Sequence, residues 1–97
     1  MARAFVSALQ GGPAARALRG PRRVFAHFRF AARPARGLPL RAAWSRDGRS
    51  VGGPVRKAFS GTVIAFVGAP GRLPAGLYRC ELRAGARVVA VASVRLR

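Results

Sequence analysis

Acidic side chains are scarce in this 97-residue sequence, which has two of them, Asp47 and Glu81, against 19 basic residues. A retaining glycosidase needs two carboxylates at a set spacing. We expect Asp47 in a turn and Glu81 on a strand, so no such pair is predicted. The single cysteine, Cys80, cannot form an intramolecular disulfide bond. Together with one histidine, His27, it cannot supply the ligands of a zinc site.

Other patterns that carry chemistry are missing as well. The sequence has no Gly-x-x-x-x-Gly-Lys phosphate loop and no run of 18 apolar residues that would predict a membrane span. A Cys80–His27 nucleophile pair is not expected, because strand alternation places the thiol on a buried face and His27 on a solvated outer face. The sequence therefore predicts a non-enzymatic chain with no catalytic residue, cofactor or metal site.

Apolar residues make up 51% of the chain, and 12 glycines and 7 prolines separate the apolar runs. This composition argues against global disorder and is typical of turn-rich all-β proteins. The clearest periodicity lies in residues 76–96, which predict two strands joined by a turn at Gly85. One face of this hairpin is expected to carry Tyr78, Cys80, Leu82, Val88, Ala90, Ala92, Val94 and Leu96.

Shorter alternating runs predict further strands at 24–30 and 40–45, and another within 55–67 that contains the apolar run 62–67. A short piece is predicted at Val51 and ends at Gly52-Gly53-Pro54. Asp47-Gly48 predicts a hairpin turn, and Pro34 with Gly37 predicts a loop. The fold class predicted is all-β, an antiparallel sandwich of about six to seven strands over residues 24–97. Residues 1–23, rich in arginine, are expected to be a flexible or short helical leader.

The formal net charge is +17, and 18 of the basic residues are arginine. One explanation is a polyanionic partner, such as nucleic acid or an acidic polymer. The other is a GC-rich genome, whose codons favour Arg, Ala, Gly and Pro. The charges are dispersed along the chain, which weakens the case for one patch. The candidate polyanion-binding residues are Arg29, Arg79, Arg83, Arg87 and Arg95. Phe25, His27 and Arg29 share a strand face that would suit nucleic acid, unless Phe25 packs beneath the leader.

Two segments resemble immunoglobulin-like domains. The stretch from Trp44 to Gly48 is similar to the end of strand C and its turn, and Gly76-Leu77-Tyr78-Arg79-Cys80 is similar to the Gly-x-Tyr-x-Cys of the tyrosine corner. The order of motifs over residues 24–97 resembles the bacterial Ig-like modules of envelope and secreted proteins. Phe28 and Phe30 stand where a disulfide-bonded domain has cysteine, so the resemblance is to the kind without the inter-sheet disulfide.

The resemblance implies structural roles for three residues: Trp44 as a core plug, Tyr78 as the corner hydrogen-bond donor and Cys80 as core. It also implies a non-catalytic accessory or interaction module that binds a protein partner, or the rest of a larger chain, through its edge strands. An extracellular or cell-envelope location would follow, although residues 1–23 lack a complete signal peptide. The alternatives are a small basic β-domain that binds nucleic acid or another polyanion, and an incomplete module of a longer protein.

Overall fold

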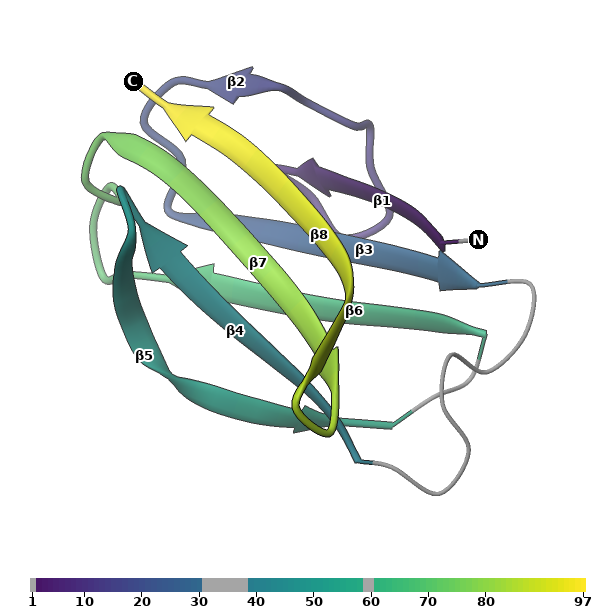
Figure 1. The fold of residues 1–97 in the computed structure, drawn as a ribbon. Helices are drawn as coiled ribbons and strands as arrows, with labels where there is room; N and C mark the ends of the chain where they lie inside the picture. The colour runs from purple at the N-terminus through teal and green to yellow at the C-terminus, as the bar shows by residue number, and fades with distance from the viewer. Residues whose placement is uncertain (1, 31–38, 59–60) are drawn as a thin grey trace.

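The computed structural model of the chain describes residues 2–30, 39–58 and 61–97 (Figure 1). Every regular element in these ranges is a β-strand, and the strands form two sheets. The three-stranded sheet has the order β1-β3-β6, and the five-stranded sheet has the order β2-β8-β7-β4-β5. The bounds are β1 Ala2–Ser7, β2 Ala17–Leu18, β3 Arg23–Phe30, β4 Leu40–Arg46, β5 Arg49–Lys57, β6 Thr62–Gly68, β7 Gly76–Ala84 and β8 Arg87–Leu96.

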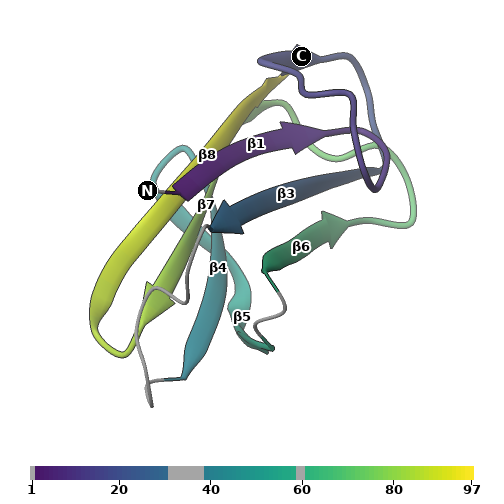
Figure 2. The ribbon, with the colours of Figure 1, turned by 90° about the vertical axis from the view of Figure 1, so that its right-hand side faces the viewer.

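The two sheets pack as layers, with β1, β3 and β6 side by side in one of them (Figure 2). Inward-facing residues of both layers form one apolar core, as expected for a sandwich of alternating strands. The all-β sandwich predicted from the sequence is therefore confirmed, with eight strands among the described residues instead of six or seven. The described part of the chain contains no helix that is long and apolar enough to cross a membrane.

The two additional strands lie in the segment predicted to be a flexible or helical leader, and the helical prediction is wrong. β1 pairs antiparallel with β3 from Ala2↔Phe30 to Ser7↔Phe25, while β2 pairs parallel with β8. In β1 the side chains alternate between the two faces of the sheet, so Val6 enters the core, where it is 1% exposed, and Phe5 stacks on His27 at the outer face. The loop predicted at Pro34 and Gly37 lies outside the described residues.

Both hairpins form where turn residues predict them. Asp47 and Gly48 join β4 to β5 with φ values of 50° and 84°, the paired left-handed conformations of a type I′ turn. The Asp47 carboxylate also accepts a hydrogen bond of 2.9 Å from the backbone N–H of Leu77. Gly85, with φ of 61°, lies in the turn between β7 and β8. The Asp47 contact ties the first hairpin to the start of β7.

A β-bulge in β8 overturns one predicted face. Leu82 pairs with Ala90 but Arg83 pairs with Val88, so Val89 is an extra residue in β8. The bulge moves Val88 to the outer face, where 38% of it is exposed, and the expectation that Val88 shares the buried face of Ala90 was wrong. No residue type in this Val-rich strand marks the position of the bulge, so the sequence did not predict it.

The prediction that Gly52-Gly53-Pro54 ends a strand was also wrong. β5 continues through these residues, and the register against β4 shifts between Ala42↔Val55 and Trp44↔Val51. Proline is tolerated here because β5 is the edge strand of its sheet, so one side of its backbone needs no ladder partner. The irregular segment bends the edge strand without terminating it.

The core contains the three residues that the resemblance singled out. Tyr78 is 1% exposed, and its hydroxyl donates a 2.8 Å hydrogen bond to the carbonyl oxygen of Pro74, four residues upstream. Cys80 is fully buried, and Trp44 is 7% exposed. Within the described residues the indole Nε1 of Trp44 is buried without a hydrogen-bond partner. A buried unpaired donor is unfavourable, so the indole is held there by its packing.

Candidate functional site

An open groove of about 690 Å³ runs over the outer face of the five-stranded sheet. Its walls come from β4, β5 and β7, and its polar lining consists chiefly of Arg41, Arg79, Arg83, Glu81, Ser45 and Ser50. Strand pairing brings these residues together, because Arg41 lies opposite Arg83, and Ser45 opposite Arg79. We call Arg41, Arg79 and Arg83, with Glu81 between the last two, the arginine groove.

Glu81 is the one carboxylate in the arginine groove. It accepts a contact of 3.4 Å from Arg79 and another of 3.1 Å from Arg83. Both arginines are about half exposed, so each ion pair contributes at most about 1 kcal/mol. One negative charge thus serves two guanidinium groups, and Arg41 has no ion pair within the described chain. The arginine groove therefore keeps a net positive charge.

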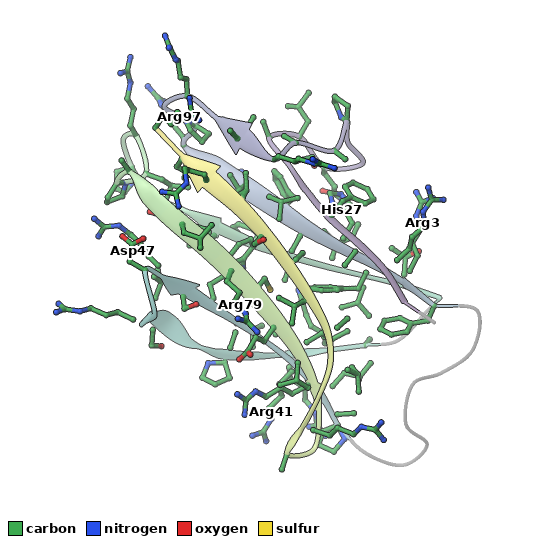
Figure 3. All side chains as sticks on the ribbon, turned by 45° about the horizontal axis from the view of Figure 1, so that its top comes forward. Arg3, His27, Arg41, Asp47, Arg79 and Arg97 are labelled. Atoms are coloured by element: carbon green, nitrogen blue, oxygen red, sulfur yellow. The ribbon has the colours of Figure 1, made fainter. Side chains whose placement is uncertain are left out.

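The structure brings together two of the five arginines that the sequence nominated for polyanion binding, Arg79 and Arg83. Arg95 lies opposite Leu77 on the same sheet, one strand further out, and Arg87 lies at the β7–β8 turn. Arg29 is on β3, in the other layer. Figure 3 shows this separation, with Arg41 and Arg79 on one sheet and Arg3 and His27 at the other.

Sequence reasoning missed Arg41. A signal for it existed, because Arg41 alternates with the buried Leu40 and Ala42 and must therefore lie on the outer face of β4. What the sequence could not supply was the pairing of β4 with β7, which places Arg41 opposite Arg83. That neighbour relation turns dispersed charges into a cluster.

The arginine groove has the chemistry of an anion receptor. Guanidinium groups present forked N–H donors that match phosphate, sulfate and carboxylate oxygens, and they stay charged at every accessible pH. They do not exchange protons, so they supply neither a general base nor a nucleophile. The hydroxyl of Ser50 already donates to the carbonyl oxygen of Gly52, at 2.9 Å. The three guanidinium groups of the arginine groove are thus suited to holding an anion.

The two residues that could form a nucleophile pair are far apart in the fold. Cys80 lies in the core side of the five-stranded sheet, and burial raises the pKa of its thiol to about 12. His27 lies on the outer face of the three-stranded sheet, since Ala26 and Phe28 face the core. The described residues also include no group of three or more His, Cys, Asp or Glu placed to hold a metal ion.

The expectation that His27 is solvated was wrong, because His27 is 2% exposed. Its ring stacks on Phe5 of β1 at a centroid distance of 4.4 Å, and its Nε2 accepts a 2.9 Å hydrogen bond from the backbone N–H of Gly11. The segment predicted as a leader supplies both contacts. An imidazole that accepts through Nε2 is neutral there, with its proton on Nδ1.

Burial lowers the pKa of His27 below its ordinary value of 6.5; the nearby carbonyl groups of Phe25 and Phe5 oppose this, and the charge of Arg29 adds to it. The unfolded chain takes up a proton below pH 6.5 while the folded chain resists it, so the free energy of unfolding should fall as the pH drops below 6.5. For a single titrating group, the free energy of unfolding can change by no more than about 1.4 kcal/mol per pH unit.

Urea unfolding at pH 7.5, 6.5 and 5.5 measures this dependence. His27→Phe is the matched control, since it keeps an aromatic ring beside Phe5 but cannot titrate. We expect the variant to unfold with nearly the same free energy at all three pH values. Equal losses in both proteins between pH 6.5 and 5.5 would show that His27 is not the titrating group.

Comparison with known proteins adds no relationship at the level of sequence. No protein-family model matches the chain, and no curated protein matches it significantly. The inferences below therefore depend on the residues and geometry already described.

Proposed function

We propose that this protein is a non-catalytic Ig-like β-sandwich that acts as an interaction module of a larger or exported bacterial protein and recognises a polyanion. The resemblance around Trp44 and Tyr78 motivates the Ig-like assignment, and the hydrogen bond from Tyr78 to Pro74 has the form of a tyrosine corner. The arginine groove is the observation that carries the binding chemistry. It concentrates three guanidinium groups around a single carboxylate on an open sheet face.

The charge of the whole chain supports the same ligand class. Of its two acidic residues, Asp47 is engaged with the backbone of Leu77 and Glu81 is shared by two arginines. Most of the positive charge is therefore available to attract a polymer of opposite sign over a Debye length of about 8 Å at physiological salt. The arginine groove then provides the short-range contacts.

Titration with inorganic polyphosphate at 50 and 200 mM salt tests this proposal, because polyphosphate carries charge and nothing apolar. Affinity should fall steeply with salt as bound counterions are released. The double variant Arg41→Ala, Arg83→Ala should bind more weakly than Arg16→Ala, Arg19→Ala, which removes the same charge near β2, at the opposite edge of the five-stranded sheet. Absent or salt-insensitive binding, or equal losses in both double variants, would refute the proposal.

A Glu81→Gln variant should bind polyphosphate more tightly than the native chain. The substitution removes the repelling carboxylate and releases Arg79 and Arg83 from their ion pairs. Repulsion between the Glu81 carboxylate and a phosphate bound nearby makes the free energy of binding less favourable by about 1–2 kcal/mol. We therefore expect the affinity of the variant for polyphosphate to rise roughly 5- to 30-fold at 50 mM salt. Isothermal titration calorimetry measures it.

Asp47→Asn is the control for net charge. It changes the formal charge by the same amount as Glu81→Gln, but Asp47 sits in the β4–β5 turn and its released partner is a backbone N–H instead of an arginine. The gain should be clearly smaller than for Glu81→Gln. If the two variants gain equally, total charge governs binding and the arginine groove does not.

A further inference from the structure

A second basic surface lies on the outer face of the three-stranded sheet. Register places its side chains in rows: Ser7, Phe25 and Phe66 in one row, Phe5, His27 and Ile64 in the next, and Arg3, Arg29 and Thr62 in the third. Arg23 lies before the first row, beside Gly68. The face is thus aromatic in its centre and basic at both ends.

This face is open to solvent at Phe66 of β6 and partly open at Phe25 of β3. Phe66 is 59% exposed, and it is the one aromatic residue among the large apolar side chains that the described chain exposes. Its ring lies 5.9 Å from that of the half-buried Phe25. The face is covered at Ser7 of β1 and at His27 of β3, which are buried beneath the segment after β1 through contacts to Leu9 and Gly11. Phe25 and Phe66 therefore form an accessible ring pair.

The charges that flank this ring pair have no carboxylate to neutralise them. None of β1, β3 and β6 contains Asp or Glu, and the two acidic residues of the chain belong to the β4–β5 turn and β7 of the other sheet. Arg23 and Arg29 are six residues apart on one strand, which corresponds to about 20 Å. A flexible anionic chain that passes on the β6 side of the covered His27 could contact both arginines and cross the rings of Phe25 and Phe66.

We propose that the outer face of the three-stranded sheet binds single-stranded nucleic acid, with a base stacked on Phe66 and phosphates contacted by Arg23 and Arg29. Aromatic platforms within a basic groove are the usual means of binding single strands without sequence preference. A duplex fits less well, because its bases stack on one another and do not offer their faces. This inference rests on the proposed polyanion-binding function and names a ligand class and a second surface for it.

Fluorescence anisotropy with 15-nucleotide oligo-dT and oligo-U tests the platform. Phe66→Ala should weaken binding of both roughly 5- to 150-fold, the range for loss of one base–aromatic stack. Val91→Ala is the matched control, because Val91 is also an exposed apolar side chain, at 38%, but lies on β8 of the other sheet, opposite Glu81. Its affinity should equal that of the native chain. Unfolding curves confirm that both variants are folded.

Polyphosphate provides the second control, since it has phosphates but no bases. Its affinity should be unchanged by Phe66→Ala. Arg29→Ala should lower the slope of log affinity for oligo-dT against log salt by about 0.7, the value for one phosphate contact on a single strand. Oligonucleotide binding that is unaffected by Phe66→Ala, or lost equally for polyphosphate, would overturn the platform while leaving polyanion binding intact. Failure of the native chain to bind any polyanion would refute both.

Discussion

A Trp44→Ala variant is expected to lose about 3–5 kcal/mol of its free energy of unfolding, the range for truncating a large buried aromatic side chain. Trp44 is 7% exposed and packs in the core with Tyr78 and Cys80, so its removal leaves a cavity between the two sheets. Urea unfolding followed by circular dichroism measures the loss, since the variant no longer has a tryptophan to report by fluorescence. A loss of this size is large against the roughly 5–15 kcal/mol of a typical domain.

Trp44→Phe separates packing from hydrogen bonding. The indole N–H is buried without a partner in the described residues, and an unsatisfied buried donor costs about 1–3 kcal/mol. Phenylalanine keeps most of the ring volume and removes this donor. We therefore expect Trp44→Phe to lower the free energy of unfolding by less than half as much as Trp44→Ala. If Trp44→Phe is as destabilising as Trp44→Ala, the indole N–H has a favourable partner and our account of the core is wrong.

Val6→Asp is expected to destabilise the protein by at least about 3 kcal/mol, because it places an unpaired carboxylate in the core. Val6 is 1% exposed and belongs to β1, which the sequence reading treated as part of a leader. A flexible leader would tolerate the substitution without effect. Urea unfolding therefore decides directly between a leader and a structural strand.

Arg3→Asp is the control on the same strand. Arg3 is exposed and lies on the outer face, so an aspartate there should change the free energy of unfolding by no more than about 0.5 kcal/mol. Should Val6→Asp prevent folding altogether, Val6→Ala offers a milder test, with an expected loss of about 1–3 kcal/mol. Equal stability of Val6→Asp and Arg3→Asp would contradict the packed β1.

The sequence predicted the all-β class and both hairpins because those features are local. Alternation with period two and the turn residues Asp47, Gly48 and Gly85 act over a few positions. It failed at β1 and β2, where the strand signal is weak: Ala2–Ser7 is short and alanine-rich, and Ala17–Leu18 gains its conformation by pairing with β8. Such strands are specified by their partners more than by their own residues.

The candidate site was predictable to a smaller extent. That arginines would lie outside follows from alternation, and Arg79 and Arg83 were identified in this way. Their grouping with Arg41 depends on which strands are neighbours, a non-local property. The burial of His27 depends likewise on Phe5 and Gly11, which precede it by more than a dozen residues and cover it through tertiary contacts. A face assignment alone cannot tell a solvated outer face from a covered one.

The positions of β5 and β6 at the ends of their sheets have a consequence for self-association. An unpaired strand edge can template pairing with another copy of the chain, and charged residues are the usual protection. β5 carries Arg49, Arg56 and Lys57, but Thr62–Gly68 has no charged residue of its own. Pairing of two copies at the β6 edge is therefore opposed chiefly by the long-range repulsion between two strongly cationic molecules. Dissolved salt screens this repulsion. Colloidal stability should thus be lowest where ionic strength is high.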